Sequence, residues 1–178
     1  EEMILAKAFE AIELSQIILF VVDKKFGISP YDKEIASIIR KSNKKVILVI
    51  NKIDVKTIEG TSIFDEFGFN EKIEVSSEHN LNIADLKNLI FSKIDQNEES
   101  LEQELPKICV MGKPNVGKSS TINSIINQEK MIVSDVPGTT IDSVDTKISY
   151  KGKNYLFIDT AGIRRKNKTV SKEEKFSV

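Results

Sequence analysis

The stretch GKPNVGKSS at positions 112–120 constrains the fold of this chain more than any other feature. It fits the spacing G-x-x-x-x-G-K-[ST], in which a glycine-rich loop turns successive backbone amides toward phosphate oxygens. The apolar run KICVMG before it predicts a buried strand, and a helix is expected to follow as far as about Asn127. The motif requires a strand before it and a helix after it, so the sequence predicts a phosphate-binding loop.

Two further short motifs extend this site. DTAG at 159–162 follows the apolar run YLFI, so Asp159 is expected at the carboxyl end of a strand, where it can hold Mg²⁺ through water. GTT at 138–140 lies in a polar stretch, and Thr140 can complete the shell of the metal when a terminal phosphate is present. For GTT alone, a solvated turn is the alternative interpretation.

The residue types assign a role to each expected ligand. Lys118 can neutralise the outer phosphates, and the hydroxyl of Ser119 can bind the metal. The expected Mg²⁺ ligands are Ser119, Thr140 and Asp159. The expected phosphate-binding residues are Asn115, Val116, Gly117, Lys118, Ser119, Ser120 and Gly162.

NKID at 51–54 follows the apolar run VILVI and is the expected base-reading motif. The carboxylate of Asp54 can accept two N–H bonds from guanine, and adenine lacks that pair of donors. The stem of Lys52 can cover the face of the base, while Asn51 either contacts the base edge or ties the loop down. Backbone amides of Ser76 and Ser77, after another short strand, are expected to meet the guanine oxygen.

Strands and helices alternate along the chain, which predicts a three-layer α/β fold with a mostly parallel sheet. The predicted strands are 17–23, 46–50, 72–75 and 107–112, followed by a hairpin of 147–150 and 155–158. The predicted helices are 2–14, 31–41, a weaker 61–67, one from 82 or 84 to 94, and one from the phosphate loop to about 127.

Composition narrows the partners and the compartment. The 178 residues carry a net charge of −1, so the overall balance favours neither DNA nor a membrane as partner, although a local patch remains open. The single cysteine, Cys109, cannot form a disulfide within the chain, and no apolar run is long enough to span a bilayer. The expected location is the cytoplasm.

The base motif precedes the phosphate motif, the reverse of the usual order, and family resemblance explains this. GKPNVGKSS, PGTTIDSVDT, DTAGIRRK and EEKFSV resemble the second GTPase domain of the bacterial tandem GTPases of the Der (EngA) family. The run from 17 to 54 resembles the latter half of the first GTPase domain of that family. The resemblance implies a fragment: 1–94 from the first domain, an acidic linker at 95–106, and 107–178 from the second domain.

The resemblance also implies an activity. It implies binding of GTP and GDP, hydrolysis of GTP with Mg²⁺, and a part in assembly of the large ribosomal subunit. Many GTPases place a glutamine directly after DTAG to orient water, but this chain has Ile163. Asn115 resembles the asparagine with which related GTPases bind potassium, which implies K⁺ as a candidate second cation. The alternative interpretation is that Asn115 only shapes the loop. The KH-like C-terminal module of the family has no counterpart here.

Three alternatives remain open from the sequence. One is a circularly permuted ribosome-assembly GTPase, which carries the same motif order in one domain. The others are a nucleotide-binding module without hydrolysis, and a P-loop ATPase in which NKID is structural. Because a half domain buries too little surface, the two halves are expected to form one continuous sheet, with both motifs at one cleft and poorly fitting side chains at the joint.

Overall fold

The computed structural model describes residues 9–57, 60–94, 105–127, 132–135 and 146–158, with the backbone alone for 132–135. Within these residues, seven strands form a single sheet in the order β3-β2-β1-β4-β7-β6-β5. The strands are β1 (Ile17–Asp23), β2 (Lys45–Asn51), β3 (Glu71–Glu74), β4 (Lys107–Met111), β5 (Ile132–Asp135), β6 (Thr146–Tyr150) and β7 (Lys153–Ile158).

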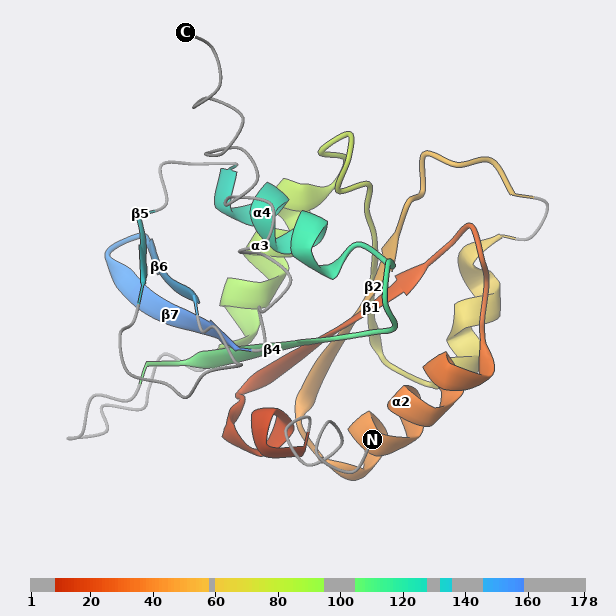
Figure 1. Cartoon of the computed structure of the whole chain (residues 1–178), viewed down its shortest axis with the longest axis horizontal. Helices are drawn as coiled ribbons and strands as arrows, with labels where there is room; N and C mark the ends of the chain where they lie inside the picture. Colours follow the sequence, from red (N-terminus) through yellow and green to blue (C-terminus); the bar gives the residue numbers. More distant parts are fainter. Residues whose placement is uncertain (1–8, 58–59, 95–104, 128–131, 136–145, 159–178) are drawn as a thin grey trace, which may run out of the picture.

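Helices cover both faces of this sheet (Figure 1). Helix α2 (Pro30–Lys41) and the 3₁₀ helix η1 (Thr61–Phe67) pack on one face, and α3 (Ile83–Lys93) and α4 (Lys118–Asn127) pack on the other. Residues 9–14 are also helical. The predicted three-layer α/β fold with a mostly parallel sheet is therefore confirmed.

The central strands form where the sequence is continuously apolar. All seven residues of β1 are buried, as expected for a parallel strand covered on both faces. Helix α2 begins where Pro30 can occupy the first turn, since its missing N–H is not needed there. The hydroxyl of Ser29 accepts from the amide of Asp32, whose carboxylate accepts from the amide of Ser29, which closes a capping box.

The two halves of the chain join at β1 and β4, which pair in parallel from Ile17 with Ile108 to Phe20 with Met111. The expected single sheet is therefore confirmed. The core beneath α3 and α4 contains side chains from both halves, so the joint is part of the main core. Beside it, Gln16 Oε1 is buried without a hydrogen-bond partner among the described residues, which matches the poor fit expected there.

Aromatic side chains close the joint on the α3 side. The ring of Phe91 stacks on Tyr150, with centroids 4.4 Å apart and an interplanar angle of 22°, and lies 4.5 Å from Tyr155. The ammonium of Lys87 lies 5.0 Å from the centroid of Tyr150. Helix α3 of the first half is thus packed on the β6–β7 hairpin of the second half.

The edge beyond β6 differs from the prediction. The expected hairpin is present, and Lys151 and Gly152 both have positive φ, as a two-residue turn of this kind requires. However, β5 pairs antiparallel with β6 at residues for which no strand was predicted. A short edge strand is held by backbone hydrogen bonds to one neighbour, so it needs no apolar alternation that a sequence pattern would reveal.

Candidate functional site

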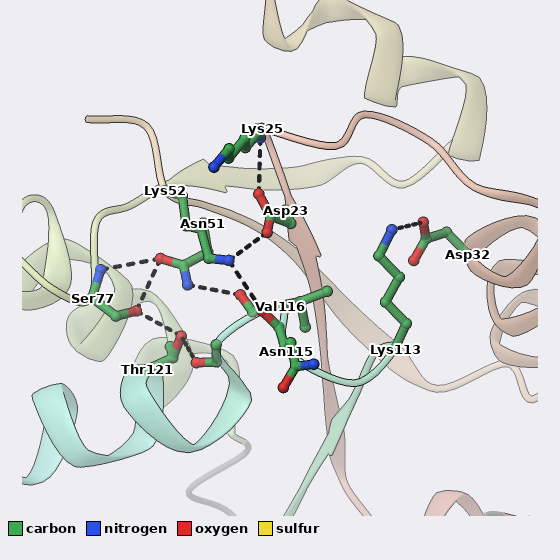
Figure 2. Close-up of polar contacts among 11 residues, drawn as sticks. Asp23, Lys25, Asp32, Asn51, Lys52, Ser77, Lys113, Asn115, Val116 and Thr121 are labelled. Atoms are coloured by element: carbon green, nitrogen blue, oxygen red, sulfur yellow. Dashed lines mark hydrogen bonds and ion pairs between the residues drawn. The ribbon is translucent and has the colours of Figure 1, made fainter. Parts of the chain in front are cut away.

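The expected base motif and phosphate loop meet at one edge of the sheet (Figure 2). Strand β2 ends at Asn51 and β4 ends at Met111, and both run parallel to β1. The carboxyl ends of parallel strands form the usual ligand-binding edge of an open α/β sheet. Because β1 lies between β2 and β4, residues from the two halves of the chain can contact one another there.

Asn51 links the two motifs directly. Its Nδ2 donates to the main-chain oxygen of Val116 at 2.9 Å, and its Oδ1 accepts from the amide and the hydroxyl of Ser77, each at 3.0 Å. The residue is only 2% exposed. Of the two roles expected for Asn51, this geometry corresponds to tying the loop down.

A chain of hydroxyl groups continues this link into α4. The hydroxyls of Ser77 and Thr121 lie 2.8 Å apart, and that of Thr121 donates to the oxygen of Gly117 at 2.9 Å. The hydroxyl of Ser124 donates to the oxygen of Ser77 at 2.6 Å. Thr121 and Ser124 were not predicted as site residues from the sequence. The signal that could have identified them is that both are polar residues on the buried face of α4.

Lys52 makes a second link between the motifs. Its ammonium donates to Asp23 Oδ2 at 2.5 Å and to the oxygen of Asn115 at 3.0 Å. Asp23 ends β1, is buried, and also accepts from the amide of Lys25 at 2.8 Å. Asp23 was not predicted from the sequence, although it shares with Asp159 the signal of a carboxylate at the carboxyl end of a strand.

Asp54 lies beside the short turn that contains Ser76 and His79. A hydrogen bond from the hydroxyl of Ser76 lowers the pKa of Asp54, and this outweighs the opposite effect of burial. His79 Nε2 lies 3.7 Å from Asp54 Oδ2, and the lowered pKa keeps the carboxylate ionised. An ionised carboxylate is the form that can accept two N–H bonds from one base.

The amides of Ser76 and Ser77 are not placed as the sequence suggested. The amide of Ser76 donates to the oxygen of Leu81 at 3.1 Å, and that of Ser77 donates to Asn51 Oδ1. Both donors are used within the protein because the turn closes on itself and Asn51 reaches into it. In this structure the two serines support Asp54 and Asn51 with their side chains and backbone.

The phosphate loop has the predicted backbone. Gly112, Asn115 and Gly117 have positive φ values of 148°, 66° and 99°. The ammonium of Lys118 donates to the oxygens of Gly112 and Lys113 at 2.6 and 2.8 Å, so it lies across its own loop. The helix that follows begins at Lys118, which directs its positive dipole end toward this loop.

Ser119 and Ser120 occupy the first turn of α4 and are half-buried. A polar hollow of about 440 Å³ runs along α4 from Ser120 to Asn127, and it reaches the turn after β3. It is lined by Ser77, Glu78, Ser120, Asn123, Ser124 and Asn127. Of these residues, Ser77 was expected to bind the base and Ser120 was expected to bind phosphate.

The remaining expected ligands, Thr140, Asp159 and Gly162, lie outside the described residues, as does Ile163. In the part of the chain that the structure describes, no group of three or more His, Cys, Asp or Glu side chains could hold a metal ion. A hydroxyl such as that of Ser119 supplies the kind of hard oxygen that Mg²⁺ prefers, but it needs further ligands. Among the described helices, none has the length and apolar character needed to cross a membrane.

Comparisons with known proteins show which family the sequence of this chain matches. The family described as "50S ribosome-binding GTPase" matches residues 1–52 and 107–178. GTPase Der of Finegoldia magna is 46% identical over 170 residues, covering 94% of this chain and 39% of the relative. GTPase Der of Fusobacterium nucleatum is 44% identical over 186 residues, covering 99% of this chain and 42% of the relative.

The fold also has a counterpart among solved structures. The crystal structure of YjeQ from Thermotoga maritima matches with a TM-score of 0.54 at 22% identity, covering 84% of this chain and 49% of that chain. This likeness concerns the fold. The chain spans about two fifths of the length of the curated relatives it matches.

The sequence matches bear on family more directly. The resemblance to the Der tandem GTPases is confirmed by relatives that are 44–47% identical. The family match includes the phosphate loop and ends, in its first part, within the base motif. The chain therefore belongs to the 50S ribosome-binding GTPase family.

Proposed function

We propose that this chain binds guanine nucleotides in a site assembled from both of its halves. The observation that carries the proposal is the hydrogen bonding of Asn51, which joins the base motif to Val116 in the phosphate loop and to Ser77. A buried side chain that is hydrogen-bonded to two loops fixes the distance between them. One nucleotide has a base and phosphates at a fixed separation, so this link suits a nucleotide that contacts both.

Guanine recognition is assigned to Asp54, which accepts from the base, and to Lys52, whose stem lies along it. The lowered pKa of Asp54 supports this role because the acceptor must be ionised. Asn51, Ser76 and Ser77 hold these two residues in position.

Phosphate binding is assigned to the loop 115–120 and to Gly162. Lys118 already lies over the loop, so a small movement of its ammonium can bring it to the outer phosphates. Ser119 would hold Mg²⁺ together with Thr140 and Asp159. When bound, the metal neutralises charge on the phosphates during transfer.

Hydrolysis of GTP is proposed for the whole protein, with water attacking the terminal phosphate in line with the leaving oxygen. Ile163 has no polar atom on its side chain with which to orient that water. Asn115 is the proposed K⁺ ligand. Its positive φ and exposed side chain support this role because the residue can present its amide oxygen outside the loop.

The whole protein is proposed to act in assembly of the large ribosomal subunit, as the family name suggests. Residues 1–94 would come from a first GTPase domain and 107–178 from a second, joined by the acidic linker 95–106. GTP and GDP are the proposed ligands and the cytoplasm is the proposed location.

Measurement of nucleotide binding by the chain tests whether it binds guanine nucleotides. Titration with fluorescent GDP, and competition with GDP, ADP and GTP, should give binding that guanine nucleotides displace and ADP does not. Lys118→Ala should remove the binding, whereas Lys41→Ala, an exposed lysine on α2, should not. Displacement by ADP at equal concentrations would favour the ATPase alternative. Release of phosphate, measured separately, distinguishes hydrolysis from binding alone.

A further inference from the structure

An exposed aromatic ring lies next to the proposed nucleotide site. Phe26 is in the loop between β1 and α2, and it is 67% exposed. A single exposed apolar side chain is ordinary on a protein surface, so the meaning of Phe26 depends on the groups around it. The neighbouring Tyr31 is also exposed.

Lysines surround this ring. The ammonium groups of Lys25, Lys52 and Lys113 lie 5.7, 5.9 and 5.7 Å from the ring centroid of Phe26. These three lysines belong to three loops: the one after β1, the base motif and the phosphate loop. The ring therefore lies where the loops of both halves meet.

The charge here differs from that of the chain as a whole, which has a net charge of −1. Two carboxylates, Asp23 and Asp32, lie in this region, and both are buried and each pairs with one lysine (Figure 2). Lys24 adds further positive charge on the loop that carries Lys25. The surface around Phe26 is thus positive and aromatic together.

We propose that Phe26 and the lysines around it form a contact site for single-stranded RNA. An unpaired base can stack on the ring, and a flanking phosphate can pair with the exposed Lys25. The contact between Lys25 and the exposed ring is weak, so this ammonium can exchange the ring for phosphate at little cost. Lys52 and Lys113 stay paired with Asp23 and Asp32 and add to the local field. A duplex keeps its base faces covered and cannot use the ring in this way.

An acidic protein segment is the competing partner for a positive surface. It could pair with the lysines, but it would make no use of an exposed aromatic face in their midst. The combination of stacking surface and cations favours RNA. The proposal goes beyond nucleotide binding and does not require it, because neither Phe26 nor Lys25 is among the proposed nucleotide ligands.

The chain offers a clean reporter for this proposal because it contains no tryptophan. In Phe26→Trp, the single indole should be quenched when a short single-stranded oligoribonucleotide stacks on it. Phe9→Trp is the matched control, since Phe9 is 50% exposed and lies in the helix before β1, whereas Phe26 follows the strand. Its emission should change little with the same RNA.

Affinity measurements without the indole complete the test. Phe26→Ala should weaken binding of the same oligoribonucleotide about tenfold, within the roughly 5- to 150-fold range typical of a lost stacking contact. Lys25→Gln should weaken binding and reduce the salt dependence by about 0.7 of one unit of slope. Phe9→Ala should bind as the unaltered chain does. Binding of fluorescent GDP, measured on the same variants, should stay unchanged and keeps this test separate from that of nucleotide binding.

Several results would overturn the proposal. Absence of RNA binding, or equal losses for Phe26→Ala and Phe9→Ala, would show that the ring is not a contact site. If a duplex of the same length bound as tightly as the single strand, charge alone would explain the binding and stacking on Phe26 would not. Binding of polyglutamate that competes with the RNA and depends on Phe26 more strongly than the RNA does would assign the site to an acidic protein.

Discussion

The side-chain amide of Asn51 lies where a β-carbon on Gly117 would stand, only 2.2 Å from its ideal position. Gly117 also has a φ of 99°, which side chains other than glycine rarely adopt. The glycine is therefore required twice, once for the shape of the phosphate loop and once for the link to the base motif. The two motifs are matched to each other although 65 residues separate Asn51 from Val116.

Gly117→Ala should break this link. The new methyl group displaces Asn51, which leaves the buried oxygen of Val116 and the groups of Ser77 without their partner. We expect a loss of roughly 2 to 4 kcal/mol in the free energy of unfolding, measured with urea, because buried polar groups left unpaired are costly. Gly60→Ala is the control, since only Ser62 Oγ comes within 4 Å of its β-carbon, at 3.9 Å. If Gly117→Ala and the unaltered chain had equal unfolding midpoints, the hydrogen bonds of Asn51 would not stabilise the fold as proposed.

Asp54→Asn should change which nucleotide is bound. The carboxylate accepts two N–H bonds from guanine, whereas the amide presents a donor that suits the additional oxygen of xanthine. We expect GDP affinity to fall about tenfold or more and xanthosine diphosphate to become the preferred ligand. Competition against a fluorescent nucleotide measures both. Asp85→Asn, on α3, is the control, and unchanged GDP affinity in Asp54→Asn would argue against NKID as a base reader.

The contribution of Asp54 to stability at acid pH should depend on Ser76. The folded chain holds the pKa of Asp54 below its ordinary value of 3.8, chiefly through the hydroxyl of Ser76. The favourable contribution of ionised Asp54 to the free energy of unfolding is therefore present above pH 3.8 and is lost as the pH falls through the lowered pKa. Ser76→Ala should raise that pKa and move the loss to higher pH. NMR titration of the Asp54 carboxyl measures the shift, and Ser92→Ala should produce none.

Much of the fold could be predicted because its signals are local. The buried strands β1 and β2 are continuous apolar runs, and Pro30 marks the start of α2. The phosphate loop was predictable for the same reason, since its spacing, the strand before it and the helix after it all lie within one short stretch. Strand β5 was missed because an edge strand of four residues depends on its neighbour.

The supporting contacts of the site could not be predicted in the same way. Asp23 meets Lys52 across 29 residues, and Ser77 meets Thr121 across 44, so each contact depends on the strand order. The amide of Ser77 was expected to face the base, but it donates to Asn51, because a backbone donor takes the nearest acceptor in the folded chain. The domain boundaries and the roles of Thr140, Asp159 and Gly162 stay predictions.

Potassium should accelerate hydrolysis if Asn115 is a cation ligand. We expect turnover of GTP by the whole protein to be about tenfold faster in potassium than in sodium at equal ionic strength, since a bound cation can stabilise charge on the phosphates. Asn115→Ala should remove the difference. Asn123→Ala, on α4, should keep it. Equal rates in the two salts, with no effect of Asn115→Ala, would rule out this role.

Phe91→Ala should show that the two halves unfold together. Phe91 is 6% exposed and contacts Tyr150 and Tyr155, so its removal opens a cavity between α3 and the β6–β7 hairpin. Losses of about 3 to 5 kcal/mol are typical of buried Phe→Ala changes. Because two of the three tyrosines in the chain lie against this ring, tyrosine emission reports on the hairpin while circular dichroism reports on the whole chain.

We expect both signals to move to the same lower urea concentration in a single transition, since one sheet and one core contain residues of both halves. Phe9→Ala removes an equally large ring that is 50% exposed, and it should leave the midpoint nearly unchanged. Two separate transitions, or a shift in circular dichroism without one in tyrosine emission, would mean that α3 and the hairpin belong to independently folding units. The site that Asn51 and Val116 share would then form only after those units dock.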